Sequence, residues 1–435
     1  MCLYIYRLLI WLILPLALLR LLYKGIKQPA YLRHWNERLT LNRLAQADIW
    51  IHAVSLGESK LAILLANELL QLFQNSDLTP KFLFSCTTPT GRAEIARWVK
   101  NNQNSGLTYL PFDCHLLQQH ALQQVQPKAL VCMETELWPN LLSVCHKRGI
   151  PTFIANARLS KSSARKQRRM LKLFRPLLQN THLLVQNTAS RRRYACLAGE
   201  QMSGNIQQCG NSKFDLPHIH NKVFQQQLAS KTTPDKGGVR LVFASTRRDE
   251  TPALMDTVIE LLTHHPQHRV IWVPRHPEQD TALLAKLLNK SSLAWGMFES
   301  GNANANASIR FLLINSFGHL TDVYYLADLV VLGGSFGAGG SHNLIEPGLM
   351  GKAIVAGPSR RNFAQAHKML ARAHAIIHLR KTEELLPELL RLIDDSGQRR
   401  EIGKAAAKAL SGHRGGTSCQ ADVIVNVLCG KAVAL

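Results

Sequence analysis

The feature that most constrains the fold is a repeated alternation of short apolar runs and amphipathic stretches, which begins near residue 45. Apolar runs occur at 49–54 (IWIHAV), 82–88 (FLFSCTT) and 129–133 (ALVCM). Each run is followed by a stretch whose apolar residues recur with helical spacing. A strand followed by a helix, repeated along the chain, predicts α/β units with a parallel sheet.

Two blocks of this alternation are separated by a polar break. Over residues 217–237 the apolar runs stop, and they resume at 239 with VRLVFAST. A chain of 435 residues also exceeds the usual size of one domain. We therefore expect a Rossmann-like domain over 26–220, a linker over 221–237 and a second Rossmann-like domain over 238–435. Ligands bind at the carboxyl ends of the strands in such sheets, so we expect the site in a cleft between the two domains.

The first 25 residues are strongly apolar and contain Arg7, Pro15 and Arg20. About twenty apolar residues can cross a hydrocarbon core of about 30 Å. The segment could span a bilayer, lie in its interface, act as a signal peptide or form a buried core helix. The signal peptide fits worst, because no small-residue cleavage site follows, and the basic residues over 24–43 are typical of a cytoplasmic flank. We expect a membrane anchor over 1–25.

The charge of the chain indicates an anionic partner. Lysine and arginine number 52 against 29 acidic residues, which gives a net charge of +23. Nucleic acid, an acidic membrane and a phosphorylated substrate are all compatible with this excess.

The nine cysteines form no C-x-x-C pair and share no zinc-site spacing with histidines. We therefore expect reduced thiols in the core of a cytoplasmic protein.

Glycine-rich and polar loops follow the apolar runs of the second half. Glycines gather over 333–340, after a predicted strand and before a helix expected near Asn343, where backbone N–H groups could face a phosphate. Such a loop could equally be a tight turn. Glu346 could accept hydrogen bonds from ribose hydroxyls. The chain has neither G-x-G-x-x-G nor the Walker lysine motif, which counts against dinucleotide oxidoreductases and P-loop enzymes.

Two further strand ends offer hydrogen-bond donors. Arg275 and His276 follow the run RVIWVP, and Ser245, Thr246 and Arg247 follow LVFA. An arginine can hold a phosphate through two parallel hydrogen bonds. A lone arginine is more often a solvated surface charge, but three adjacent loops with donors favour a phosphate site.

Acidic side chains follow the predicted strands of the first half. Glu134 and Glu136 come directly after ALVCM and would face one side if the backbone were extended. Lys213 lies farther along, near the end of the first block. Glu58 follows Gly57 after the first strand, where it could carry chemistry or only stabilise a helix N-terminus.

Eight motifs occur together in an order that resembles the Kdo transferases of lipopolysaccharide assembly, the WaaA/KdtA family: HAVSLGE, TPTGR, ETELWPN, NARLS, GNSKFD, PRHP, GGS followed by HNLIEP, and GPSRRNF. The resemblance extends from the N-terminal anchor to about residue 370. It implies an α/β GT-B fold with two Rossmann-like domains facing a central cleft, without a metal or cofactor. It also implies attachment to the bacterial inner membrane with cytoplasmic catalytic domains. The implied reaction is inverting transfer of 3-deoxy-D-manno-octulosonic acid (Kdo) from CMP-Kdo to a lipid A precursor, lipid IVA.

The resemblance also implies roles for individual residues. Glu58 would be the general base, and Glu134 and Lys213 would stabilise the transition state. Leaving-group departure from the anomeric carbon creates cationic character, so electrostatic preorganisation should dominate catalysis. The residues implied to bind CMP are Pro274, Arg275, Gly318, His319, Leu320, Asn343, Leu344, Ile345 and Glu346. Further donor contacts are expected from Ser245, Thr246, His276 and Gly340.

Four positions depart from the family pattern, all in the donor half. Arg247 stands where the family usually has histidine, His319 where glutamate is common, Ser341 where glycine is found, and Ser359 where histidine is usual. These departures bear on the placement and identity of the donor more than on the reaction class. A GT-B enzyme with another nucleotide sugar therefore stays an alternative.

Basic clusters complete the sequence pattern. Residues 158–169 carry six cationic side chains, and three arginines follow at 191–193. A bisphosphorylated lipid in an anionic leaflet would attract them by about 1 kcal/mol per cation. A solvated helix face is the simpler explanation, and a non-catalytic membrane adaptor is a further alternative. We expect no nucleic-acid partner, since no recognised motif or interleaved aromatic residue accompanies the clusters.

Overall fold

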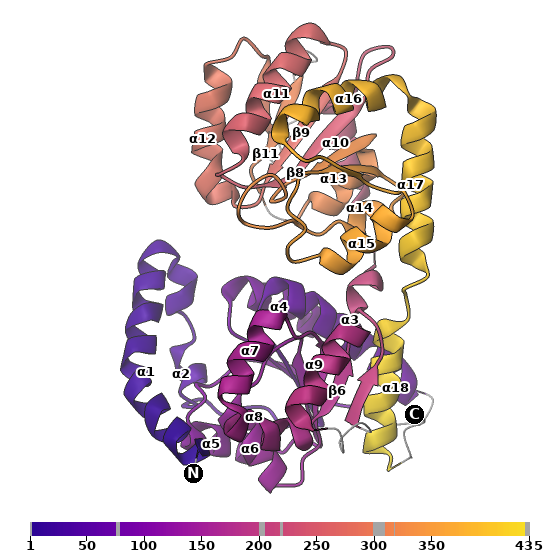
Figure 1. Ribbon diagram of the computed structural model, residues 1–435. Helices are drawn as coiled ribbons and strands as arrows, with labels where there is room; N and C mark the ends of the chain where they lie inside the picture. Colours follow the sequence, from indigo (N-terminus) through magenta and orange to yellow (C-terminus); the bar gives the residue numbers. More distant parts are fainter. Residues whose placement is uncertain are drawn as a thin grey trace. The chain divides into compact units, whose positions relative to one another are not determined.

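The fold consists of two α/β units, each built on a parallel sheet. The computed structural model describes residues 2–74, 79–199, 205–217, 221–298, 309–316 and 318–430. The first unit comprises Met1–Leu216 together with Arg414–Leu435, and the second comprises Pro217–His413. Figure 1 gives the element labels.

The first unit contains a seven-stranded sheet in the order β3-β2-β1-β4-β5-β6-β7. The strands are β1 (Ile49–Ala53), β2 (Phe82–Cys86), β3 (Ser105–Tyr109), β4 (Ala129–Met133), β5 (Thr152–Ala157), β6 (His182–Val185) and β7 (Ile206–Gln208). All their pairings are parallel. The central strands are buried throughout, as near-continuous apolar runs of a parallel sheet should be. The predicted strands at 49–54, 82–88 and 129–133 are therefore confirmed.

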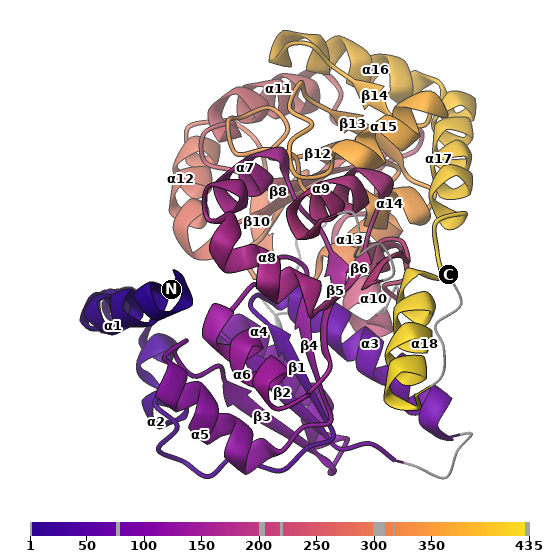
Figure 2. The ribbon, with the colours of Figure 1, turned by 60° about the horizontal axis from the view of Figure 1, so that its bottom comes forward.

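Helices cover both faces of this sheet. They are α3 (Leu56–Gln74), α4 (Pro89–Lys100), α5 (His115–Val125), α6 (Pro139–Lys147), α7 (Lys161–Arg169), α8 (Leu171–Gln179), α9 (Thr188–Ala198) and α18 (Gly416–Leu428). Residues of α3, α4 and α18 join one core cluster, and residues of α5, α6 and α8 join another. Figure 2 shows α3 and α18 on one side of the strands and α5 and α6 on the other.

The second unit repeats the plan with the strand order β10-β11-β9-β8-β12-β13-β14. Its strands are β8 (Arg240–Thr246), β9 (Arg269–Pro274), β10 (Trp295–Phe298), β11 (Phe311–Ile314), β12 (Leu329–Leu332), β13 (Ala353–Ala356) and β14 (Ile377–His378). Its helices are α10 (Lys222–Lys231), α11 (Thr251–His264), α12 (Pro277–Asn289), α13 (Leu320–Leu326), α14 (Ile345–Leu349), α15 (Ala364–Arg372), α16 (Leu385–Asp394) and α17 (Ser396–Ser411). Helices α11, α12 and α16 bury their apolar residues in one cluster, and α10 and α13 in another.

The structure divides the chain differently from the predicted domains at two places. The predicted linker over 221–237 contains α10, whose Phe224 and Leu228 are buried in a core cluster of the second unit. Residues 414–430 do not belong to the second unit, because α18 packs on α3 and β5 of the first. Met1 and residues 218–220, 299–308, 317 and 431–435 of the predicted segments lie outside the described residues.

The cysteine prediction was wrong for several thiols. Cys209 and Cys419 form a disulfide with their Cα atoms 5.4 Å apart. The pair could not be read from a spacing, because 210 positions separate the two residues and the return of α18 brings them together. Cys196 and Cys429 are free but exposed, whereas Cys86, Cys114, Cys132 and Cys145 are buried free thiols as expected.

The apolar N-terminus forms α1 (Cys2–Lys27), which continues into η1 (Pro29–Leu32) and α2 (Trp35–Arg38). Within the described residues it is the one helix long and apolar enough to cross a membrane, and none of that apolar window is buried. The apolar window is therefore not packed into the core of either unit in this structure. Near its start, Tyr6 donates a hydrogen bond of 2.9 Å to Asp113, and Arg7 donates one of 3.2 Å to Asn140. The first turns of α1 are therefore attached to the loop before α5 and to the first turn of α6.

A buried carboxylate in α2 fixes the edge of the first sheet. Glu37 is 8% exposed and accepts two hydrogen bonds from Arg92, of 2.6 and 2.8 Å. It also accepts one from the backbone N–H of Tyr109. Removing one member of a buried ion pair leaves the other charge unpaired, which is costly.

We expect Glu37→Gln to lower the free energy of unfolding by about 3 kcal/mol, because Arg92 loses its charged partner. Denaturant unfolding of the full chain in detergent measures this change. The matched control is Glu94→Gln, which removes the exposed ion pair with Arg97. The control should change the free energy by less than about 1 kcal/mol. Equal effects of the two substitutions would contradict the assignment of Glu37.

Candidate functional site

The site in the first unit is built where the strand order of its sheet reverses. Strands β1 and β4 pair side by side, and the helices that follow them lie on opposite faces. Ligands in open parallel sheets bind at such a switch point, beyond the carboxyl ends of the strands. Glu58 lies in the first turn of α3, after β1, and Glu134 comes directly after β4.

Glu58 is bonded into the start of α3. Its carboxylate accepts hydrogen bonds of 2.9 Å from the Val54 backbone N–H and of 2.9 Å from the Ser55 hydroxyl. This is a variant of the Ser-x-x-Glu capping arrangement, so the predicted helix-stabilising role is confirmed. Burial raises the pKa of Glu58 above its usual value, and the nearby negative charge of Glu134 acts in the same direction.

Glu134 and Lys213 form an ion pair beside Glu58. Lys213 Nζ lies 2.6 Å from Glu134 Oε1, and the two side chains are 22% and 13% exposed. Glu134 has a φ of +58°, a region that non-glycine residues seldom occupy. Its backbone N–H donates to the Ala155 carbonyl over 2.8 Å. The sequence predicted that Glu134 and Glu136 face one side if the backbone is extended. The positive φ shows that the backbone is not extended at Glu134, so this condition is not met.

Glu136 is a functional candidate that the sequence pointed to without a role. Burial raises its pKa to about 7, and the charges of Glu58 and Glu134 push the pKa in the same direction. Because the charges of Glu58 and Glu134 act on Glu136, and the charge of Glu134 acts on Glu58, the three carboxylates lie close together. With Lys213 they form an acidic cluster that contains one cation.

The second unit has a corresponding switch point between β8 and β12, which pair in its sheet. The glycine-rich loop over 333–340 follows β12, as predicted, but several of its backbone N–H groups are already bonded. Glu250 accepts hydrogen bonds from Gly334 and Phe336, of 2.5 and 3.0 Å, and Asp249 accepts one of 2.9 Å from Ala338. These three N–H groups therefore do not face a phosphate, contrary to the expectation. Buried or semi-buried N–H groups require acceptors, and the loop after β8 supplies them.

Cationic and imidazole side chains gather at the same switch point. Arg247 donates a hydrogen bond of 3.2 Å from Nε to His342 Nε2. Burial lowers the pKa of His342 to about 3, and the charges of Arg275 and Arg247 lower it further. Burial also lowers the pKa of Arg275, with Arg247 adding to the effect. Among the described residues, no ion pair joins either arginine to an acid. The arrangement suits a phosphate, which would supply the missing negative charge.

The other predicted donor residues lie around these loops. Pro274 ends β9, His276 is the N-cap of α12, and Ser245 and Thr246 are buried at the end of β8. Gly318 and Gly340 have positive φ values. His319 and Leu320 begin α13, and Asn343, Leu344, Ile345 and Glu346 enter α14, which packs against α13. The side chains of Leu344 and Ile345 are buried in the protein, so only their backbone groups could contact a nucleotide.

Each donor-half departure has a structural partner. The Ser341 hydroxyl is buried and lies 2.8 Å from His367 Nε2. His319 stacks on Phe224, with ring centroids 4.1 Å apart. The backbone N–H of Ser359 donates to Ser335. Together with the bond between Arg247 and His342, these contacts show that the substituted residues are integrated into the loops.

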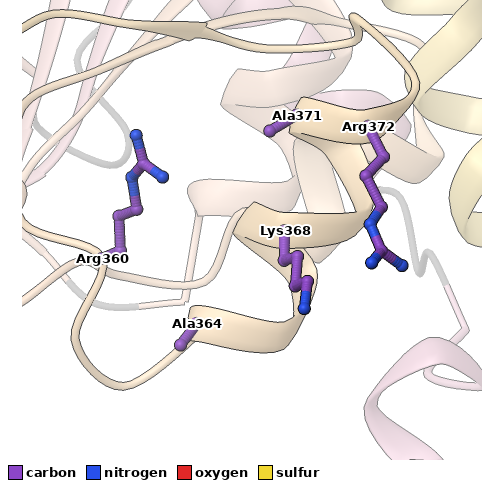
Figure 3. Close-up of a pocket in the computed structure, with 5 residues that line it drawn as sticks. All are labelled: Arg360, Ala364, Lys368, Ala371 and Arg372. Atoms are coloured by element: carbon purple, nitrogen blue, oxygen red, sulfur yellow. The ribbon is translucent and has the colours of Figure 1, made fainter.

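The second unit contains a hollow of about 530 Å³ that was not predicted from the sequence. It is lined by Arg360, Ala364, Lys368, Ala371 and Arg372. Figure 3 shows Arg360 directed away from the ends of Lys368 and Arg372, so the three cations do not converge on one point. The four-residue spacing of 364, 368 and 372 on α15 was the signal for a shared helix face.

The basic clusters lie on two helices of the first unit. Helix α7 carries exposed Lys161, Arg165, Lys166, Arg168 and Arg169. It packs beside α9, and Arg193 of α9 donates a hydrogen bond of 2.6 Å to the Leu159 carbonyl. The two basic segments therefore form one surface.

In the described part of the chain, there is no group of three or more histidine, cysteine, aspartate or glutamate side chains that could hold a metal ion.

Comparison with known proteins shows that this chain is similar to Kdo transferases. Residues 33–216 match the family model of 3-deoxy-D-manno-octulosonic-acid transferases, or kdotransferases. The 3-deoxy-D-manno-octulosonic acid transferase of Haemophilus influenzae is 29% identical over 416 residues, which cover 94% of this chain and 95% of the relative. The enzyme of the same description from Bordetella pertussis is 28% identical and covers 87% of each chain.

A solved structure supports the fold. The UDP-GlcNAc 2-epimerase from Neisseria meningitidis, bound to UDP-GlcNAc, aligns with a TM-score of 0.60 over 88% of this chain and 100% of the epimerase, at 11% identity. The fold is thus of the GT-B-like kind, with two parallel-sheet α/β domains. Both relatives align over most of their length and the family model covers most of the first unit, and these similarities support a Kdo transferase, which is a glycosyltransferase.

Proposed function

We propose that this chain transfers Kdo from CMP-Kdo to a lipid A precursor, lipid IVA, with inversion at the anomeric carbon and with Glu58 as the general base. Similarity to the Kdo transferases supports the sugar. The observation that carries the mechanism is the cluster at the β1 and β4 ends, where Glu58 lies beside the ion pair of Glu134 and Lys213.

The proposed step is a direct displacement. The acceptor hydroxyl oxygen forms a bond to the anomeric carbon of Kdo while the bond from that carbon to the CMP phosphate oxygen breaks. CMP leaves with the bonding electrons, and the hydroxyl proton passes to Glu58. One base is sufficient for such a displacement, and no covalent intermediate on the protein is formed.

Glu58 can cap α3 and still accept this proton. Each carboxylate oxygen has two lone-pair directions, and the Val54 and Ser55 donors occupy one on each oxygen. The remaining directions are available to a hydroxyl. A raised pKa makes the carboxylate a stronger base, and the fixed hydrogen bonds hold it in one orientation.

Glu134 and Lys213 stabilise opposite charges in this proposal. The anomeric carbon becomes cationic as CMP departs, and a carboxylate nearby stabilises that charge. The Lys213 ammonium balances the carboxylate of Kdo or the departing phosphate. Holding the two groups 2.6 Å apart before the substrate arrives removes reorganisation from the barrier.

The donor half would bind CMP. Arg247 and Arg275 place two guanidinium groups near one point without an acidic partner among the described residues, which favours a phosphate. The family roles of Pro274, of 318–320 and of 343–346 add the remaining CMP contacts. Ser245, Thr246, His276 and Gly340 border the same loops and stay proposed donor contacts.

We further propose that α1 anchors the chain to the bacterial inner membrane, with both α/β units in the cytoplasm. The exposed apolar surface of α1 provides the hydrophobic contact. The surface formed by α7 and α9 provides cations for anionic lipid headgroups and for the phosphates of the acceptor.

The base is tested with Glu58→Gln, because the glutamine oxygen can still accept from the Val54 N–H and its amide nitrogen can donate to the Ser55 hydroxyl, but the amide cannot take the proton. CMP release from CMP-Kdo with lipid IVA should fall roughly 100- to 10,000-fold. The melting temperature, measured alongside, should change little. Turnover equal to that of the unmodified chain would reject Glu58 as the base.

The donor is tested with Arg275→Ala. Loss of a charge-assisted hydrogen bond should raise the KM for CMP-Kdo roughly 10- to 100-fold. Arg372→Ala, on the outer face of α15, is the matched control and should leave KM unchanged.

The identity of the donor nucleotide is tested by comparing how much CMP and UDP raise the melting temperature. A larger increase with UDP would favour another nucleotide sugar. Mass spectrometry of the lipid product then gives the identity and number of the added sugars.

The membrane surface is tested by replacing Arg165, Lys166 and Arg169 of α7 with alanine. Removal of three cations at about 1 kcal/mol each should weaken binding to anionic vesicles roughly 100-fold, and high salt should reduce the difference. The control replaces Arg400, Lys404 and Lys408, which are exposed on α17. Equal losses in both variants would show that only the total charge matters.

A further inference from the structure

Helix α18 is attached to the segment that carries Lys213, although about 200 residues separate them in the chain. Lys213 lies in η3 (Ser212–Phe214), directly after β7. Asp215, at the end of η3, accepts hydrogen bonds from the backbone N–H groups of Gly415 and Thr417, both of 2.7 Å, and from the Thr417 hydroxyl. The start of α18 is thereby fixed to one end of the Lys213 segment.

Close packing joins the same segments before η3. A side chain at Gly416 would meet the backbone of Gly210 and Asn211 at 3.0 to 3.2 Å, so the first turn of α18 lies directly against residues 210–211. The disulfide between Cys209 and Cys419 adds a covalent connection. Helix α18 therefore contacts the segment from 209 to 215 at both of its ends.

Gln420 is the buried side chain at the centre of this attachment. It is fully buried and uses both ends of its amide. Its Nε2 donates a hydrogen bond of 3.0 Å to the Ser212 hydroxyl, next to Lys213. Its Oε1 accepts one of 2.8 Å from the Asn156 backbone N–H, at the end of β5.

The β5 end also holds the partner of Lys213. The Ala155 carbonyl accepts the backbone N–H of Glu134, and the Asn156 side chain accepts the backbone N–H of Ser212 over 3.1 Å. Asn156 has a φ of +52°, so its neighbours must hold it in this conformation. Gln420 thus contacts the segment that carries Lys213 and the end of β5, whose Ala155 carbonyl holds the backbone N–H of Glu134.

We propose that Gln420 of α18 is a positioning residue for Kdo transfer, which fixes the separation of Glu134 and Lys213 by bridging the ends of β5 and the η3 segment. The proposal rests on the proposed roles of Glu134 and Lys213. Gln420 itself is buried and touches neither substrate. A displacement of about 1 Å in a catalytic group can cost roughly 100-fold in rate, so this bridge matters to kcat.

The test is Gln420→Met, which keeps the length of the side chain and removes both hydrogen bonds. Assays contain dithiothreitol, so that α18 is held by non-covalent contacts alone. We expect kcat for CMP release to fall roughly 10- to 100-fold, while the KM for CMP-Kdo stays within about twofold. Gln420→Glu should recover much of kcat, because its carboxylate can accept from both Asn156 and the Ser212 hydroxyl.

The matched control is Ile424→Val, one turn farther along α18. Ile424 is fully buried in the core of the first unit and forms no bridge to the Lys213 segment. We expect a loss of stability of the ordinary size for a core methyl group, without a change in kcat. Equal kcat values for Gln420→Met and Ile424→Val, or a change of Gln420→Met in KM alone, would overturn the proposal.

The pH dependence of kcat/KM distinguishes a positioning role of Gln420 from a purely structural role, which would leave this dependence unchanged. Lys213 lowers the pKa of Glu58, whereas Glu134 raises it. If Lys213 moves away in Gln420→Met, the pKa of Glu58 rises and the acid limb of the pH profile of kcat/KM should shift to higher pH.

Lys213→Ala separates the two proposals. An unchanged kcat in Lys213→Ala would reject the proposed role of Lys213. A low kcat in Lys213→Ala together with an unchanged kcat in Gln420→Met would reject only the role of Gln420.

Discussion

The ion pair between Glu134 and Lys213 depends on more of the structure than any other contact near the candidate site. The two side chains belong to segments after β4 and β7, which are not neighbours in the sheet. They reach 2.6 Å because β5 supports the backbone of Glu134 and α18 supports the segment of Lys213. Electrostatic preorganisation requires such support, since a lysine on a mobile segment would have to be ordered during the reaction.

The acids of the two units serve different purposes. In the first unit, Glu58, Glu134 and Glu136 lie together, and burial with mutual repulsion raises the pKa values of Glu58 and Glu136. In the second unit, Glu250 and Asp249 are occupied by backbone N–H groups of the glycine-rich loop. The first group is suited to proton transfer, and the second gives a loop of many glycines a fixed shape. The cations beside that loop, Arg247 and Arg275, form no ion pair with an acid among the described residues.

Periodicity and turn residues predicted the parallel strands and the two α/β units, because buried parallel strands are continuous apolar runs. The position of Glu58, Glu134 and Arg275 at strand ends followed from the same pattern. The pattern could not show that α18 returns to the first unit, since an amphipathic helix does not specify which sheet it covers. The disulfide, the role of Gln420 and the occupied N–H groups of the 333–340 loop all depend on such long-range pairing. Glu136 was visible in the sequence, but its pKa depends on burial that no local motif encodes.

The return of residues 414–430 to the first unit also determines the order in which the chain can be completed during synthesis. The ribosome releases this segment only after the whole of 217–413 has emerged. Until then the 209–215 segment lacks Gln420, Thr417 and Cys419, and one face of the first sheet lacks a helix that contributes Ala421 and Ile424 to its core. Contacts between residues so distant in sequence form slowly. The segment of Lys213 therefore acquires its full set of contacts only when α18 docks, so a chain truncated before residue 414 would lack them.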